Sequence, residues 1–192
     1  MNKERITKAI ADRNRVILAF LALAKEKVFL KLSEEEKINL VNDVILEGED
    51  VASWALSEYK TNDPRKIASS MGLRIFGEEK KELKKSEYRP EKKEIAISRR
   101  FHEKILQKFP LSNLSEHVLK IIVAHELFHH IEIDRVGKIY KKHPITVFKL
   151  GPIAIKKQIR GLSEVAAQAF THKLLSLKLS PEVFDYLLLT SF

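Results

Sequence analysis

The sequence predicts an α+β protein, in which a small antiparallel sheet packs against helices and an N-terminal helical extension precedes them. Apolar residues recur at helical spacing toward both ends of the chain, whereas short alternating segments occupy the middle. A length of 192 residues and a hydrophobic content of 44% suffice for one domain with its own core. We expect the extension to cover 1–60 and the main domain to cover 61–192.

Composition limits the chemistry that the chain can use. It has no cysteine, which excludes disulfides and thiolate metal sites, so any zinc must be held by histidine and carboxylate. The net charge of +9 permits binding to nucleic acid or to an acidic surface. Lysine and glutamate alternate through 77–94, however, which favours mixed charge over a basic face. We expect a cytoplasmic protein.

The N-terminus has two interpretations. A basic stretch precedes nine apolar residues (VILAFLALA), as in a secretory signal, which would make the protein secreted. Against this, the basic stretch contains Glu4 and Asp12, and helical spacing of apolar residues continues to Val28. We therefore expect one packed amphipathic helix over 3–30. The apolar run is too short to span a bilayer.

A second helix is predicted from its start signal. Ser33 with Glu36 three residues later forms a capping box. The helix is expected to end near Glu47, where "GED" breaks it, and a third helix is expected over 51–59.

A helix and a strand follow. Asp63 can cap a short helix, Pro64 suits its first turn, and Gly72 suits its C-terminal cap. The residues after Gly72 are expected to form a strand over 73–78.

Two more strands are predicted over 83–89 and 94–99, joined by a hairpin turn at "PEKK". Ile95 and Ile97 share one side of the later strand, which is the pattern of a half-buried strand.

The C-terminal third turns helical again. Asn113, with Glu116 three residues later, caps a long helix that carries "HELFHH" near its end. Glycines and prolines predict a loop over 135–152. Further helices are expected over 162–178 and from Ser180 onward.

The segment "IIVAHELFHHIEI" carries the chemistry. His125 and His129 are four apart on the predicted helix, so their imidazoles point the same way and can bind one zinc ion. Glu126 can then act as the catalytic acid/base. This is the H-E-x-x-H zincin motif. The alternative is a pair of histidines at a helix end, favoured there by the helix dipole.

A catalytic zinc needs a third protein ligand. The candidates are His130, Glu132, Asp134, His143, Glu164 and His172. Of these, Glu164 is favoured because it opens a second helix, whose small alanines allow a close approach to the first. The alternative is an ordinary first-turn acid. Glu132 and Asp134 would need the helix to break, and His130 points about 100° away from His129.

Supporting roles are less specified. His130 is expected to be a helix-end or ligand-supporting residue. His172, Tyr88 and Tyr140 are candidates for stabilising an oxyanion.

Three pieces of the chain resemble the ImmA/IrrE family of zinc metallopeptidase-like proteins. They are "DPRKIASSMGLRIF", "VAHELFHHIEI" and "EVAAQAFTHKLL", and the resemblance covers about 61–180. It implies zincin-like packing of the ligand-bearing helices, with His125, His129 and Glu164 as metal ligands and Glu126 as the catalytic residue. Phe128 departs from the family's usual glycine, "LLSLKLSP" departs from its "LLMP", and 1–60 does not match its core.

We therefore expect a zinc-dependent, gluzincin-like endopeptidase whose substrate lies against the edge of the sheet. The resemblance implies a regulatory protein as substrate, such as a transcriptional repressor. The alternative is a non-proteolytic regulatory module that binds a protein partner or DNA. Manganese, iron or nickel would also accept this ligand set.

Overall fold

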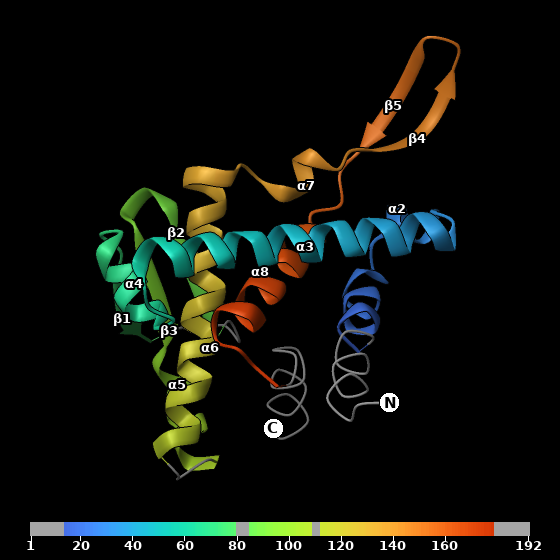
Figure 1. The fold of residues 1–192 in the computed structure, drawn as a ribbon. Coiled ribbons are helices and arrows are strands. Elements are labelled where there is room, and N and C mark those ends of the chain that lie inside the picture. The colour runs from blue at the N-terminus through green and yellow to red at the C-terminus, as the bar shows by residue number, and fades with distance from the viewer. Residues whose placement is uncertain (1–13, 80–84, 109–111, 179–192) are drawn as a thin grey trace, which may run out of the picture.

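The computed structural model describes residues 14–79, 85–108 and 112–178. They form an α+β fold with a three-stranded sheet and a separate two-stranded hairpin, β4–β5, that projects from the body (Figure 1). Residues 14–23 are helical. The other elements are α2 (Lys27–Leu30), α3 (Glu34–Tyr59), α4 (Pro64–Ser70), β1 (Arg74–Glu78), β2 (Ser86–Arg89), η1 (Pro90–Lys92), β3 (Glu94–Ser98), α5 (Arg99–Lys108), α6 (Ser112–Ile131), η2 (Glu132–Val136), α7 (Ile139–Lys142), β4 (Ile145–Leu150), β5 (Ile153–Lys157) and α8 (Gly161–Leu174).

The N-terminal segment is not the single helix that was predicted over 3–30. The helix of 14–23 ends in a turn, and the short helix α2 follows it; residues 3–13 lie outside the described part of the chain. Ala19, Leu23 and Phe29 are buried in the same core as α8. The division of the chain at residue 60 stays a prediction.

Helix α3 begins at the predicted capping box and continues past its predicted end. The Ser33 hydroxyl accepts from the Glu36 N–H at 3.2 Å, and the Ser33 N–H donates to the Glu36 carboxylate at 2.8 Å. The predicted break at "GED" is wrong. Gly48 serves a close contact instead, since a Cβ there would lie 2.3 Å from the carbonyl oxygen of Ala166 in α8. The small residues of α8 therefore also allow a close approach to α3.

The short helix α4 and strand β1 agree with their predicted signals. The Asp63 carboxylate accepts from the Arg65 N–H at 2.9 Å, Pro64 stands in the first turn, and Gly72 follows the helix with a φ of 72°. Glycine adopts this left-handed conformation without steric penalty, so the chain turns there into β1.

The three-stranded sheet is mixed, so the prediction of a purely antiparallel sheet is wrong. The strand order is β1-β3-β2, with β2 antiparallel and β1 parallel to β3. The predicted "PEKK" turn is confirmed as the 3₁₀ turn η1, after which Lys93 adopts a left-handed φ of 51°. Ile95 and Ala96 are both fully buried, so β3 is covered on both faces rather than half-buried.

Helix α5 was not predicted, and it leads from β3 toward α6. Helix α6 begins at Ser112, one residue before the predicted cap Asn113, whose side chain is outside the description. After α6 the chain continues as the π-helical turn η2.

The prediction of a loop over 135–152 is largely wrong, because η2, α7 and β4 occupy most of this segment. Strands β4 and β5 pair across Gly151 and Pro152, which form the hairpin turn. Helix α8 begins one residue before the start of the helix predicted over 162–178 and ends four residues before its predicted end, at Leu174. The helix predicted from Ser180 lies outside the described residues.

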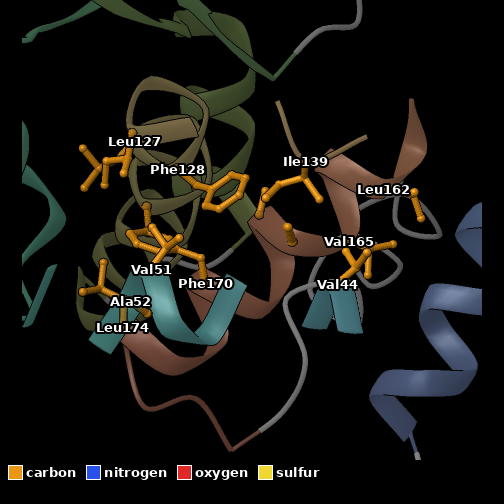
Figure 2. Packing of buried hydrophobic residues seen from close by; sticks show 14 of the residues in the cluster. Val44, Val51, Ala52, Leu127, Phe128, Ile139, Leu162, Val165, Phe170 and Leu174 are labelled. Atoms are coloured by element: carbon orange, nitrogen blue, oxygen red, sulfur yellow. The ribbon is translucent and has the colours of Figure 1, made fainter. Parts of the chain in front are cut away.

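The core forms where α8 packs against both α3 and α6. Figure 2 shows side chains from α3, α6, α7 and α8 meeting there. Phe128 of α6 and Phe170 of α8 are both fully buried, with ring centroids 5.5 Å apart. This packing fixes the relative position of the two helices that carry the predicted metal ligands.

None of the helices in the described part of the chain combines the length and apolar character needed to span a bilayer.

Candidate metal centre

Helices α6 and α8 bring the three predicted ligands together. Nε2 of His125 lies 3.2 Å from Nε2 of His129, one helical turn away on α6. Glu164, in the first turn of α8, approaches both imidazoles: its Oε2 lies 3.2 Å from His125 Nε2, and its Oε1 lies 3.6 Å from His129 Nε2. Among the described residues, these three side chains form a group that could hold a metal ion.

The donor atoms lie close enough together to share one metal ion: one atom from each residue can be chosen so that all three lie within 4.8 Å of one another. Ligand bonds of 2.0–2.2 Å separate neighbouring donors of a tetrahedral zinc by about 3.3–3.6 Å. The two imidazoles lie 3.2 Å apart, and Glu164 presents one oxygen to each of them, at 3.2 Å and 3.6 Å. Two imidazoles and one carboxylate leave a fourth position for water or substrate, as in catalytic zinc sites.

The buried carboxylate of Glu132 contacts the ring nitrogen of His129 that faces away from the other two ligands. Glu132 lies in η2 with one carboxylate oxygen 3.5 Å from Nδ1 of His129. Its other oxygen accepts from the Ile139 N–H at 2.9 Å and from the Ser163 hydroxyl. Glu132 thus joins the end of α6 to the starts of α7 and α8. A carboxylate on the far ring nitrogen commonly orients a metal-binding histidine.

The charges of the metal-free site interact strongly. Burial alone would lower the pKa of His129, but Glu132 and Glu164 outweigh it and raise that pKa to about 10. Hydrogen bonds from His125 and His129 hold the pKa of Glu164 well below its usual range. Burial would raise the pKa of Glu132, yet its three hydrogen-bonding partners bring it below the ordinary value. A metal cation that binds here would therefore displace a proton from His129, and the ionised carboxylates of Glu132 and Glu164 would attract it.

Glu126 lies next to the ligand His125 and contacts the edge strand of the sheet. Its Oε1 accepts from the Ser86 hydroxyl at 2.6 Å, and its Oε2 accepts from the Tyr88 N–H at 2.8 Å. The Tyr88 N–H points away from β3 and toward Glu126. The carboxylate therefore occupies a hydrogen-bonding position on the outer edge of β2. Glu126 is 7% exposed, and it lines the cavity described below.

His130 and Tyr88 form a pair next to the site. The Tyr88 hydroxyl lies 2.7 Å from Nδ1 of His130, and the two rings meet edge to face. Burial lowers the pKa of His130 and raises the pKa of Tyr88, so both side chains are neutral near pH 7. His130 ties the end of α6 to β2 rather than joining the metal ligands.

The remaining third-ligand candidates lie elsewhere. His143 contacts Glu47 of α3, Asp134 is exposed on η2, and His172 lies in the last turn of α8. None of these three belongs to the ligand group found among the described residues.

A cavity of 620 Å³ opens in front of the ligands. The polar strand β2 forms one wall, and Tyr140 of α7 and the cations Lys138 and Arg160 form others. Of the predicted oxyanion candidates, Tyr140 and Tyr88 line this cavity. The Tyr88 hydroxyl is already bound to His130.

Phe128 is buried between α6 and α8. Its side chain points into the core and packs on Phe170, and its ring centroid lies 5.8 Å from that of His129. It therefore holds the ligand-bearing part of α6 against α8.

Three neighbours of the ligands have contacts that the sequence did not predict. They are Ser86, Ser163, which directly precedes Glu164, and Glu132, which supports a ligand although it was predicted only as a candidate ligand. The spacing of His129 and Glu132, three residues apart, is a signal that could have identified the supporting role.

Comparisons of the chain with protein-family models, with curated proteins and with solved structures give no match.

Proposed function

We propose that the protein is a zinc-dependent endopeptidase of the ImmA/IrrE type. The observation that carries this proposal is the convergence of His125, His129 and Glu164 within 4.8 Å of one another, with Glu126 beside them in one cavity. The H-E-x-x-H motif and the resemblance in sequence favour zinc among the metals that this donor set accepts.

The roles of the residues follow from this arrangement. A zinc ion held by the three ligands would polarise the scissile carbonyl and acidify water. Glu126 accepts the proton of the attacking water and passes it to the leaving amine. Glu132 keeps His129 turned toward the cavity.

We propose that the peptide binds along β2, which is an edge strand that lines the cavity. An extended peptide can add to such an edge through main-chain hydrogen bonds. Pairing there would compete for the Tyr88 N–H and release the Glu126 carboxylate for catalysis.

The substrate that we propose is a regulatory protein, such as a transcriptional repressor, in the cytoplasm. This part rests on the resemblance of the three sequence segments.

The direct test compares wild type with Glu126→Gln, both loaded with zinc, on β-casein as an unfolded general substrate. Loss of a catalytic acid/base lowers rates by about 10²–10⁴-fold. We expect wild type to generate new peptide N-termini, detected by mass spectrometry, and Glu126→Gln to lose this activity while retaining its zinc. Glu58→Gln is the matched control, because Glu58 is an exposed carboxylate of α3 that does not line the cavity.

A non-proteolytic binding module is the second candidate, favoured by the Glu126 contacts to β2. Both of its carboxylate oxygens already accept from protein donors. Equal cleavage by wild type and Glu126→Gln, or no cleavage by zinc-loaded wild type of β-casein or of coexpressed repressors, would favour this candidate.

A further inference from the structure

The hairpin β4–β5 carries an apolar face that no buried core residue covers in the described part of the chain. Each residue of β5 is exposed, and so is each of β4 after Ile145 (Figure 1). Phe148 pairs with Ile155, and Leu150 with Ile153, so these four side chains share one face. They are 50–67% exposed. We call them the apolar face of the hairpin.

The most exposed of these side chains lie at the tip. Leu150 is 67% exposed and Ile153 is 62% exposed, and Gly151 and Pro152 form the turn between them. An isolated two-stranded hairpin is marginal in water, and contiguous exposed apolar side chains usually mark a binding surface. The apolar face of the hairpin is therefore a candidate binding surface.

The segment of the sequence that contains the hairpin has charges of one sign. From Arg135 to Ser163 the sequence contains eight lysines and arginines and no aspartate or glutamate. This segment holds +8 of the chain's net +9. Lys149 and Lys156 lie on the opposite face of the hairpin from the apolar face, and Lys157 lies at its base. All three lysines are exposed.

The shape and chemistry favour a lipid surface over other occupants. A stable protein interface buries about 800 Å² on each partner, whereas this hairpin presents a narrow projecting tip. Nucleic acid is a poor fit for the apolar face of the hairpin, because its charged backbone would lie against four apolar side chains. A bilayer interface accepts an apolar tip to a depth of about 5–10 Å while lysines reach anionic headgroups. A six-residue strand is about 20 Å long, which is sufficient for this insertion.

We propose that β4–β5 docks the protein on an anionic phospholipid bilayer, with its apolar face and tip in the interface and its lysines on the headgroups. The hairpin follows Lys138 and Tyr140 and precedes Arg160, all of which line the metal cavity. Docking would hold that cavity close to the membrane surface. This inference does not depend on the proposed peptidase activity.

The test uses sedimentation with phospholipid vesicles. The full chain is mixed with vesicles of phosphatidylcholine alone or with about a third phosphatidylglycerol. We expect wild type to sediment with the anionic vesicles and to be released by salt. Leu150→Ser/Ile153→Ser should reduce partitioning about tenfold or more, and so should Lys149→Glu/Lys156→Glu. The matched control is Leu46→Ser on α3, where the leucine is 56% exposed but lies outside the hairpin.

A second measurement shows insertion directly. The chain has one tryptophan, Trp54 on α3. Phe148→Trp should give a blue-shifted emission with anionic vesicles that wild type does not give. Circular dichroism spectra that match wild type would show that the variants are folded.

Three results would overturn the proposal. The first is wild type that does not bind anionic vesicles, and the second is binding that Leu150→Ser/Ile153→Ser leaves unchanged. The third is a dimer, detected by light scattering, that this variant converts to monomer, since the occupant would then be a second copy.

Discussion

The carboxylate of Glu132 faces Nδ1 of His129 at 3.5 Å, on the side of the ring opposite Glu164. The same carboxylate accepts from Ser163, the residue before the third ligand. One buried side chain thus positions ligands on both α6 and α8.

Replacing Glu132 with glutamine should weaken zinc binding. Mutating groups that support metal ligands typically lowers affinity by 10–100-fold, and we expect a loss in that range. Competition with a chromophoric chelator measures it. Ser163→Ala, which leaves the His129 contact in place, is the matched control and should lose less. Equal affinity of Glu132→Gln and wild type would contradict the positioning role.

Zinc binding should release protons at pH 8. The pKa of His129 is raised from 6.5 to about 10 in the metal-free protein, so the imidazole is protonated there and must lose its proton to bind. About one proton should leave per zinc, and affinity should fall about tenfold for each pH unit below 10. Calorimetry in buffers of different ionisation enthalpy counts these protons. A His129 of ordinary pKa would release almost none.

The same shift gives a stability prediction for the metal-free protein. A raised folded-state pKa contributes stability that is complete below pH 6.5 and is lost as pH rises through about 10. Thermal melts of chelator-treated protein should therefore shift downward across that interval. His129→Gln should show a smaller downward shift, and an equal shift in both proteins would argue against this origin.

Gly48→Ala should destabilise the protein. The added Cβ would lie 2.3 Å from a backbone oxygen of α8, so the two helices must separate. Overpacking of this kind costs about 1–3 kcal/mol, although alanine is the better helix former by about 1 kcal/mol. Urea denaturation measures the net loss. Gly77→Ala is the control, because its added Cβ would meet only the flexible side chain of Arg99 at 3.2 Å. A Gly48→Ala protein as stable as wild type would mean that α3 and α8 are not in close contact.

Phe128→Ala should lower the free energy of unfolding more than Gly48→Ala does. Truncating a fully buried phenylalanine costs about 3–5 kcal/mol, and this ring joins α6 to α8. Zinc stoichiometry should survive under conditions where the variant is folded, because the ring lies on the core side of α6. Leu46→Ala, at an exposed position, should change the unfolding free energy little.

Local signals in the sequence predicted most of the elements around the site. The capping box at Ser33, the Asp63–Pro64 helix start and the turn at 90–93 depend on neighbouring residues, and the structure has each of them. The placement of His125 and His129 on one helical face follows from their spacing alone.

The errors arose where contacts distant in sequence decide the structure. Gly48 was interpreted as a helix break because its partner Ala166 is 118 residues away. The parallel pairing of β1 with β3 has no local signal. The β4–β5 hairpin has a local signal in the sequence, because strand-forming residues flank Gly151 and Pro152. The prolines and glycines of this segment led instead to the prediction of a loop.

Metal content measured by elemental mass spectrometry tests the three-ligand zinc site most directly. Wild type, Glu126→Gln and Glu164→Ala should be purified side by side and incubated with zinc. We predict about one zinc per chain in wild type and in Glu126→Gln, and a weakened or lost metal in Glu164→Ala. Wild type that holds no zinc, or Glu164→Ala that holds it as tightly as wild type, would contradict the site.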